Sequence, residues 1–253
     1  MSESLVHHDH VGGVSTITLD SQHNRNALSA QLLAELDAAI DAAEAADSRV
    51  LVLRHEGPAF CAGADLKERR SGPPDSGPMV RVLERLMDTS RPTIAAVNGA
   101  VRAGGIGLMA SCDLIVVHHS IDFALTEVRI GVAAAIISVP ILRRVQPGRI
   151  AAAVLTGERF DATAALNMGL VTHVTDDVTT TVDHLIDGIL AGAPTAVAES
   201  KAMLRRVPGL DRTAAFAEMR TLSERLFSGD DAAEGMAAFV EKRLPSWNPL
   251  SGN

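Results

Sequence analysis

The chain has 253 residues, of which 47% are apolar and 21% are charged. This is the balance of an ordinary folded globule and excludes a disordered, collagenous or coiled-coil protein. With 3% aromatic residues and a formal net charge of −8, a base-stacking platform for nucleic acid is not expected, and a polyanion could bind only through a local basic patch.

The first half of the chain alternates strand and helix patterns. Residues 14–19 alternate apolar and polar side chains, which predicts a half-buried strand. A helix is expected over residues 29–46, with Ser29 as its cap. The all-apolar run at residues 50–53 is typical of a strand covered on both faces.

Residues 71–78, SGPPDSGP, form the stretch richest in residues that break helices and strands. The alternation resumes after it, which predicts a mobile loop or lid rather than a domain boundary. A helix is expected at residues 79–87. Two further buried strands, at residues 93–97 and 114–117, enclose a glycine-rich segment.

Helix patterns dominate the rest of the chain, interrupted by one expected strand at residues 170–174. Four helices are expected after it, at residues 178–191, 194–207, 211–227 and 231–242. Asp231 with Glu234 resembles a capping box. We therefore predict the α/β class, with an α/β core at residues 1–193 and a helical region at residues 194–253.

Cys61 and Cys112 are too few to form a disulfide framework, which indicates a reducing compartment. The first ten residues carry Glu3, His7, His8, Asp9 and His10 where a signal peptide needs an apolar run. No stretch approaches the roughly 18 apolar residues of a membrane span. We expect a cytosolic protein that binds neither nucleic acid nor membrane. The histidines at 7, 8 and 10 fit an exposed strand better than a metal site, and no metal is expected.

Three interpretations of the glycine-rich segment differ in how well the sequence fits them. Residues 105–110 fit the dinucleotide pattern G-x-G-x-x-G/A, but they do not follow their strand directly, as that fingerprint requires. Ser111 lacks the G-x-S-x-G surroundings of a nucleophile. The third interpretation fits better, because glycines let a ligand approach the N–H groups of a helix start. A second small-residue loop at 60–66 could supply another such N–H group to a developing oxyanion.

Several motifs follow one another along the chain: NRNALS at 24–29, FCAGADLK at 60–67, FALTE at 123–127, ALNMGLV at 165–171 and EGMAAFVEKR at 234–243. Together they resemble the enoyl-CoA hydratase/isomerase family, also called the crotonase family, over about residues 14–247. The resemblance implies a spiral of β-β-α turns followed by helices that assemble a homotrimer or a dimer of trimers. It also implies an acyl-CoA thioester substrate, with coenzyme A as part of the substrate and no separate cofactor.

Carried over by position, the resemblance implies an oxyanion hole made by the backbone N–H groups of Ala64 and Gly104. The hydratases of the family use two glutamates. The second corresponds to Glu127, whereas the first falls on Gly107, which cannot activate a water molecule. Glu127 is therefore the one strong acid/base candidate, and burial would raise its pKa.

The segments around Gly107 and Glu127 resemble most closely bacterial members similar to 3-methylglutaconyl-CoA hydratase, which have one catalytic glutamate. The substrates of that branch carry a second carboxylate. Arg102 stands where the family usually has an apolar residue, and it could pair with that carboxylate. A structural ion pair of Arg102 is the alternative.

The resemblance also implies contacts with coenzyme A. Arg25 and Lys67 correspond to positions near the nucleotide, with Arg69 and Arg70 next on the same loop. The predicted binding set is completed by Ala62, Asp65, Leu66, Gly105, Phe239 and Lys242. The last two correspond to residues that reach coenzyme A, sometimes from a neighbouring subunit.

Hydration of a 2-enoyl-CoA thioester is the favoured function. Double-bond isomerisation comes second, and decarboxylation or thioester hydrolysis follows. A protein of another class, a non-catalytic acyl-CoA binder, also fits a chain that lacks one glutamate. Such a binder would hold acyl-CoA tightly without turning it over.

Overall fold

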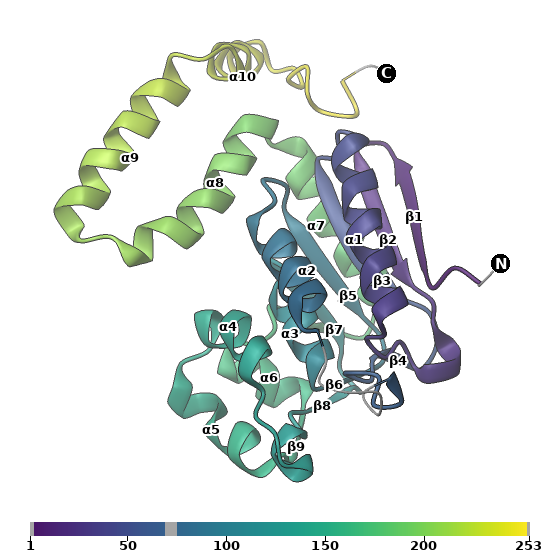
Figure 1. The fold of residues 1–253 in the computed structure, drawn as a ribbon. Helices are drawn as coiled ribbons and strands as arrows, with labels where there is room; N and C mark the ends of the chain where they lie inside the picture. The colour runs from purple at the N-terminus through teal and green to yellow at the C-terminus, as the bar shows by residue number, and fades with distance from the viewer. Residues whose placement is uncertain (1–2, 69–74, 252–253) are drawn as a thin grey trace.

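The computed structural model describes residues 3–68 and 75–251. Two sheets with helices around them form the body of the protein, and three helices near the C-terminus extend away from it (Figure 1). The predicted α/β class is confirmed. The loop predicted at 71–78 lies partly outside the described residues, and helix α2, Gly77–Asp88, begins within its last two positions.

The larger sheet has the strand order β1-β2-β3-β5-β7-β10 in the described chain. The strands are Val6–Val11, Val14–Leu19, Val50–His55, Thr93–Val97, Leu114–His118 and His173–Thr175, in that order. β1 pairs antiparallel with β2, and the other neighbours pair parallel. Parallel strands are buried on both faces, which accounts for the continuous apolar runs of β3, β5 and β7.

Helices cover both faces of this sheet (Figure 1). Val52 of β3 belongs to a buried cluster with Val182 of α7, Val178–Ala191. Leu53, the next residue, points to the opposite face and belongs to the main core, which includes the buried side of α1, Ala30–Ala45. This alternation is the period of two that a strand imposes.

Helix α1 begins as the sequence predicts. Ser29 is its N-cap, and its hydroxyl accepts a hydrogen bond from the N–H of Leu32 at 3.1 Å. Leu28, directly before the cap, donates its N–H to the carbonyl of Gly63 at 2.7 Å. The start of α1 is thereby fixed to the second small-residue loop.

The smaller sheet has the order β4-β6-β8-β9, with strands Ala59–Cys61, Ala100–Arg102, Asp122–Ala124 and Arg159–Asp161. From β3 onward, three successive turns of chain each place one strand in the larger sheet, one in the smaller sheet and then a helix. The helices that follow β4, β6 and β8 are α2, α3 (Gly104–Ala110), and the short 3-10 helix η3 (Glu127–Ile130) with α4 (Ala135–Arg144). The expected spiral of β-β-α turns is confirmed. Helices α5, Pro147–Thr156, and α6, Ala162–Met168, precede β10.

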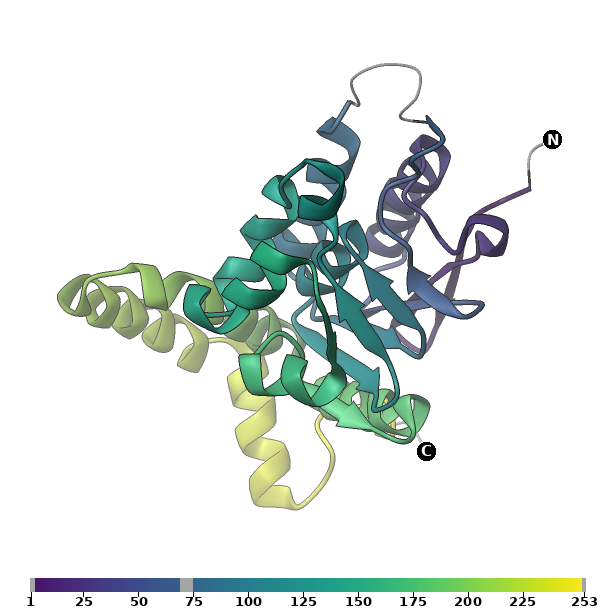
Figure 2. The same cartoon turned by 90° about the horizontal axis from the view of Figure 1, so that it is seen from below.

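Three helices, α8 (Pro194–Arg206), α9 (Arg212–Phe227) and α10 (Asp230–Glu241), form the C-terminal arm, which projects to one side of the body (Figures 1 and 2). Arg49 holds both ends of this arm. Its guanidinium donates to the carbonyls of Leu190 and Gly192 before the arm and to that of Trp247 after it. The domain boundary at 193/194 and the role of the arm in assembly stay predictions.

Two local expectations were wrong. The last strand begins at His173 rather than at residue 170, because Leu170 donates its N–H to Ala165 and closes the end of α6. The capping box is absent from α10, whose N-cap is Gly229. Glu234 instead accepts two hydrogen bonds from Arg243, which together with the N–H of Ser246 lowers the pKa of its carboxyl to about 2.

Candidate active site

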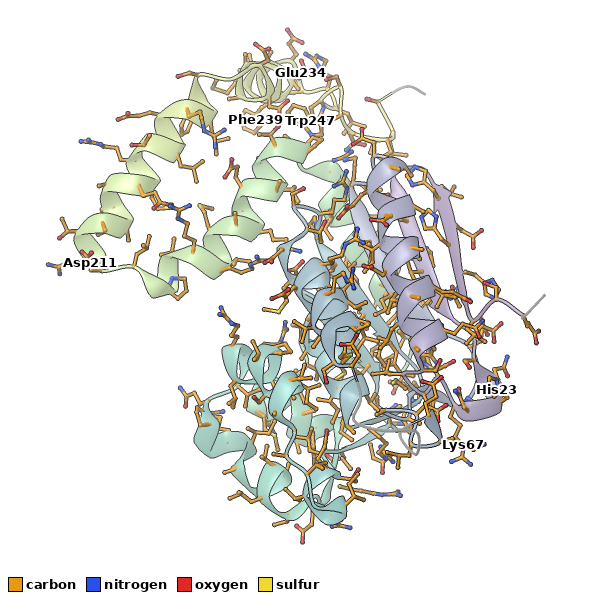
Figure 3. The ribbon with its side chains drawn as sticks, viewed as in Figure 1. His23, Lys67, Asp211, Glu234, Phe239 and Trp247 are labelled. Carbon is orange, nitrogen blue, oxygen red and sulfur yellow. The ribbon has the colours of Figure 1, made fainter. Side chains whose placement is uncertain are left out.

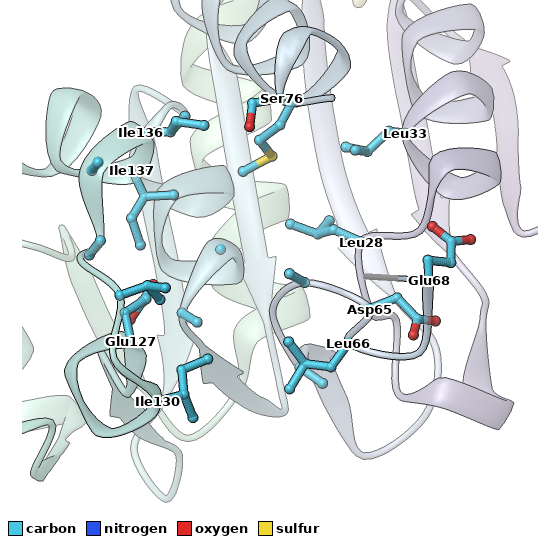
Figure 4. Close-up of a pocket in the computed structure, with 18 of the residues that line it drawn as sticks. Leu28, Leu33, Asp65, Leu66, Glu68, Ser76, Glu127, Ile130, Ile136 and Ile137 are labelled. Atoms are coloured by element: carbon cyan, nitrogen blue, oxygen red, sulfur yellow. The ribbon is translucent and has the colours of Figure 1, made fainter. Parts of the chain in front are cut away.

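A cavity of about 700 Å³ lies between the start of α1 and the segment that joins β8 to α4. Figure 4 shows Leu28, Leu33 and Leu66 on one side of it and Glu127 and Ile137 on the opposite side. The first turn of α2 and the start of α3 complete its lining. Most of these side chains are apolar, so the cavity suits a ligand with a hydrocarbon part.

The cavity brings half of the predicted site residues together. Those that line it are Ala62, Ala64, Asp65, Leu66, Gly104 and Glu127. The residues of the predicted set that do not line it are Arg25, Lys67, Arg102, Gly105, Phe239 and Lys242. Arg69 and Arg70 lie outside the described residues.

Two backbone segments meet at the cavity wall, the loop around Gly63 and the start of α3. Gly63 has a φ of +91°, and a Cβ built on it would lie 2.9 Å from the Cβ of Ala103 and 3.6 Å from the backbone N of Gly104. A Cβ built on Gly104 would lie 2.8 Å from Cδ1 of Leu28 and 3.9 Å from the backbone N of Ala64. The absence of side chains at both glycines allows this close approach. The amides of Ala64 and Gly104 therefore lie near each other.

Both of these N–H groups lack a hydrogen-bond acceptor among the described residues. Ala64 forms an isolated bridge with Leu28, but the bonds of that bridge use the N–H groups of Leu28 and Asp65. Gly104 is the first residue of α3, where a helix offers no acceptor to its own N–H. Two free N–H groups on one wall can stabilise an oxyanion, typically by about 3 kcal/mol each.

The residue before Gly104 has a strained backbone. Ala103 has φ 46° and ψ −118°, a conformation that favours glycine. Its N–H donates to the carbonyl of Ala124 in β8 at 2.9 Å, which fixes the start of α3 to the smaller sheet. Such strain costs on the order of 1–3 kcal/mol and often accompanies functional sites.

Glu127 is the first residue of η3 and lies opposite this wall (Figure 4). Its Oε2 atom is buried and has no hydrogen-bond partner in the described part of the chain. Burial raises the pKa of the Glu127 carboxyl, and the hydrogen bond with its own backbone opposes this only in part. A carboxyl in such surroundings is suited to accept and return a proton near neutral pH.

Position 107, where the resemblance implies the first glutamate, has no room for a side chain. Gly107 lies in the buried helix α3 against Ile137 of α4, a side chain that also lines the cavity. A side chain at position 107 would have to displace Ile137. Of the two glutamate positions that the resemblance implies, only position 127 carries a side chain that lines the cavity.

Arg102 was predicted to bind a substrate carboxylate, and the structure places it elsewhere. Its guanidinium donates to Asp122 Oδ1 at 2.7 Å and to the carbonyls of Val101 and Asp122. β6 and β8 are neighbouring strands, which brings these side chains together. The structural ion pair, the alternative left by the sequence, is the one present.

Gly105 serves packing rather than the cavity. A Cβ built on it would lie 2.6 Å from the Cβ of Cys61 and 2.9 Å from the Cys61 carbonyl oxygen. Both Cys61 and Cys112 are buried free thiols, and burial raises the pKa of each to about 12. These thiols therefore act as small core residues.

The predicted coenzyme A contacts are widely separated within one chain. Phe239 lies on α10, the last helix of the C-terminal arm, at the top of the view, whereas Lys67 lies at the lower right (Figure 3). The Phe239 side chain is 85% exposed, and Lys242 ends the same helix. Arg25 ends the short 3-10 helix Gln22–Asn24, and its carbonyl accepts the N–H of Ala62. Their contacts with coenzyme A stay predictions.

Sequence reasoning missed most of the apolar wall. Leu33, Met79, Ile130 and Ile136 line the cavity, yet each fits the pattern of an ordinary amphipathic segment. Periodicity does not distinguish a side chain that faces a cavity from one that faces the core.

The described residues contain no cluster of three or more histidine, cysteine or acidic side chains that could hold a metal. They also contain no helix long and apolar enough to cross a bilayer.

Comparisons with known proteins extend over almost the whole chain. The model of the family "Enoyl-CoA hydratase/isomerase" matches residues 9–249. The enoyl-CoA hydratase EchA19 of Mycobacterium tuberculosis is 32% identical over 252 residues, covering 93% of each chain. The carnitinyl-CoA dehydratase of Proteus mirabilis is 33% identical over 202 residues, covering 74% of this chain and 76% of the relative. A crystal structure of an enoyl-CoA hydratase of Mycobacterium smegmatis has a TM-score of 0.90 at 33% identity, covering 97% and 99% of the two chains.

Proposed function

We propose a reaction for this chain from the premise that it belongs to the enoyl-CoA hydratase/isomerase family. That family acts on acyl-CoA thioesters. The proposed reaction is the addition of water to a 2-enoyl-CoA thioester. The observation that carries it is the meeting of three groups in one cavity: the free N–H groups of Ala64 and Gly104, and the carboxyl of Glu127, whose Oε2 atom is buried.

The thioester carbonyl oxygen would accept hydrogen bonds from both N–H groups. Negative charge develops on this oxygen when a nucleophile adds to Cβ of the enoyl group, and donors already in place stabilise that charge without reorganising. The hydrogen bonds from the N–H of Leu28 to the carbonyl of Gly63 and from the N–H of Ala103 to the carbonyl of Ala124 fix the two segments that carry these amides. The substrate carbonyl is thereby polarised toward an enolate.

Glu127 would then carry one proton through both halves of the reaction. Its carboxylate takes a proton from water as the water oxygen bonds to Cβ, which yields the enolate. The protonated carboxyl returns that proton to Cα, which restores the carboxylate and completes the addition of H and OH. The raised pKa of Glu127 favours this exchange, because the protonated and ionised forms are closer in energy near neutral pH.

Isomerisation is the second candidate, and the contact between Gly107 and Ile137 favours it. Hydrocarbon stands where a second carboxylate would project, so a single base serves the reaction. Glu127 would remove a proton from C2 of a 3-enoyl thioester and return it to C4 of the dienolate. This sequence moves the double bond and requires no water. One relative is a carnitinyl-CoA dehydratase, and loss of water is the reverse of hydration, so this relative supports the first candidate.

The test is to incubate the purified protein with 2-enoyl and 3-enoyl thioesters in ¹⁸O-labelled water and to measure product mass. Thioesters with and without a terminal carboxylate, 3-methylglutaconyl-CoA included, form the panel. Gain of one labelled water establishes a hydratase, unchanged mass with a moved double bond establishes an isomerase, and loss of CO₂ a decarboxylase. Acyl-CoA binding without any product would overturn both proposals in favour of a non-catalytic binder.

Two glutamate variants complete this test. Glu127→Gln keeps the size of the side chain but removes its proton exchange, and we expect turnover to fall by about 10²–10⁴-fold. Glu84→Gln is the matched control, since Glu84 is exposed on α2 and does not line the cavity. Full activity of Glu127→Gln would exclude Glu127 as the proton carrier.

A further inference from the structure

No hydrogen bond fixes the Glu127 carboxyl at its Oε2 atom within the described residues. This atom is buried, so water does not replace the missing partner. A side chain without such a bond is oriented by its rotamer, by packing and by the segment that carries it. The precision of the site therefore depends on what holds η3 in place.

Hydrogen bonds within this segment are local. Arg129 donates its backbone N–H to Thr126, Gly131 to Val128, and Val132 to Glu127, at 3.0, 3.4 and 3.2 Å. These bonds shape the turn but do not fix it to the body of the protein. Three apolar side chains of the segment are also largely exposed, namely Val128 at 38%, Ile130 at 59% and Val132 at 54%. Burial of η3 thus contributes little to holding it.

One side-chain hydrogen bond joins η3 to another element in the described chain. Arg129 donates from Nε to the carbonyl of Thr156 at 3.0 Å. Thr156 is the last residue of α5, where helix carbonyls lack intrahelical donors and the helix dipole favours a cation. A guanidinium at this end satisfies a carbonyl and complements its charge.

The side chain of Arg129 also packs against Gly157, the residue after α5. Gly157 has a φ of +67°, and a Cβ built on it would lie 2.9 Å from Nε, 3.1 Å from Cγ and 3.2 Å from Cδ of Arg129. α5 is itself anchored in the core by Ile150 and Ala153. Arg129 therefore connects the segment that carries Glu127 to a fixed point.

We infer that Arg129 is a positioning residue for Glu127: by binding the C-terminal end of α5, it holds η3 so that the Glu127 carboxyl faces the Ala64 and Gly104 amides across the cavity. This inference rests on the proposed function for its consequence in turnover. A displacement of about 1 Å at a catalytic group can cost about 100-fold in rate. The loss of this tether acts on kcat rather than on thioester binding.

The experiment compares three variants of the full chain. Arg129→Met keeps the apolar stem over Gly157 but removes the donor. Arg129→Lys restores a cationic donor. Arg149→Met is the matched control, because Arg149 of α5 makes the same kind of bond, to the carbonyl of Asn167 at 2.7 Å, with no hydrogen bond to η3 among the described residues.

We expect kcat of Arg129→Met to fall by about 10–100-fold with KM within about threefold of wild type. Arg129→Lys should recover most of this loss, and Arg149→Met should retain wild-type kcat. A kcat of Arg129→Met within twofold of wild type, or a loss that Arg149→Met shares, would overturn the inference. If Arg129 had only a structural role, Arg129→Met and Arg149→Met would lower kcat equally, and Arg129→Lys would not restore it.

A second readout does not depend on turnover. Amide hydrogen exchange at Arg129, Gly131 and Val132, whose N–H groups are bonded within the turn, should be at least about tenfold faster in Arg129→Met. It should be unchanged in Arg149→Met. If the wild type turns over none of the thioesters but this difference is found, the proposed function fails while the tether stands. Equal exchange in the two methionine variants would overturn the tether itself.

Discussion

Gly107 of α3 and Ile137 of α4 pack so closely that position 107 has no room for a side chain. A Cβ built on Gly107 would lie 2.3 Å from Cγ2 of Ile137, 2.5 Å from its Cβ and 3.2 Å from its Cα. Both residues are buried. The two helices thus approach each other at this point through the missing side chain. The glutamate that hydratases of the family carry here would require α4 to move, so its absence is built into the packing of the fold.

The first prediction concerns the stability of Gly107→Ala. Alanine normally stabilises a helix relative to glycine by about 0.5–1 kcal/mol. Here the close contact reverses the sign, and we expect the free energy of unfolding to fall by about 1–3 kcal/mol, as for an overpacked core. Urea unfolding measures this. Gly188→Ala in α7, where nothing lies within 4 Å of the added Cβ, is the control and should gain stability.

Combining this change with Ile137→Gly isolates the contact. That substitution removes both atoms closest to the added methyl and leaves the Cα at 3.2 Å. The cost of Gly107→Ala should therefore be much smaller in the Ile137→Gly background than in wild type. An equal cost in both backgrounds would show that another contact opposes the methyl group.

The second prediction concerns Glu127 and pH. Burial raises the pKa of Glu127 in the folded state above its value in the unfolded chain. The folded protein therefore binds the proton more tightly, and stability falls as pH rises from the unfolded pKa through the folded one. Glu127→Gln removes this loss. We expect the variant to be more stable than wild type at pH 7.

The difference between Glu127→Gln and wild type should close below the ordinary pKa of a glutamate, where the wild-type side chain is protonated in both states. Urea unfolding across pH 3–8 follows it, with Glu84→Gln as the exposed control that should show no such trend. A stability gain that persists unchanged at pH 3 would assign it to packing rather than to desolvation of the charge.

The third prediction separates two adjacent glycines. A methyl on Gly104 meets the flexible end of Leu28 and comes within 3.9 Å of the Ala64 amide, so Gly104→Ala should fold and lose about 10²–10³-fold in kcat. A methyl on Gly105 meets the Cβ and the backbone oxygen of Cys61. Gly105→Ala should therefore lose mainly stability. Thermal unfolding and steady-state kinetics on both variants distinguish these roles, and equal loss of stability would contradict the assignment.

Sequence patterns predicted those elements of the fold that are long enough to show a regular run of apolar residues or a recognisable cap. The buried strands β3, β5 and β7 are continuous apolar runs, and Ser29 caps α1 as its residue type suggests. The strands of the smaller sheet have three residues each, too short for a period of two to be recognised, and only the family resemblance implied them. Local pattern also misplaced β10, because the buried Leu170 and Val171 extend the apolar run beyond the paired residues.

For the site, motif order located Ala64, Gly104 and Glu127, which the structure places in one cavity. Arg102 shows the limit of such reasoning. Its partner Asp122 is 20 residues away and becomes a neighbour only through the pairing of β6 with β8. A sequence shows that a cation stands at an unusual position, but the partner that neutralises it depends on tertiary contacts.

The fourth prediction concerns the attachment of the C-terminal arm to the body. Lys201 of α8 is 6% exposed, and its ammonium donates to Asp113 Oδ2 at 2.7 Å and to the carbonyl of Arg91 at 2.8 Å. The same carboxylate oxygen accepts the N–H and the hydroxyl of Thr93. Desolvation lowers the pKa of Lys201, and the carboxylate opposes this effect.

Lys201→Met should lower the free energy of unfolding by about 3–5 kcal/mol, because it leaves a partly buried carboxylate without its cation. One turn later on α8, Arg205 pairs with Asp88 at 2.6 Å, but these side chains are 40% and 70% exposed. Arg205→Met should cost less than about 1 kcal/mol, since water screens that pair. Lys201→Met with Asp113→Asn should recover part of the loss, as the uncompensated charge is then removed. Equal costs for the two single variants in urea unfolding would mean that Lys201 contributes no more than a surface ion pair to holding the arm.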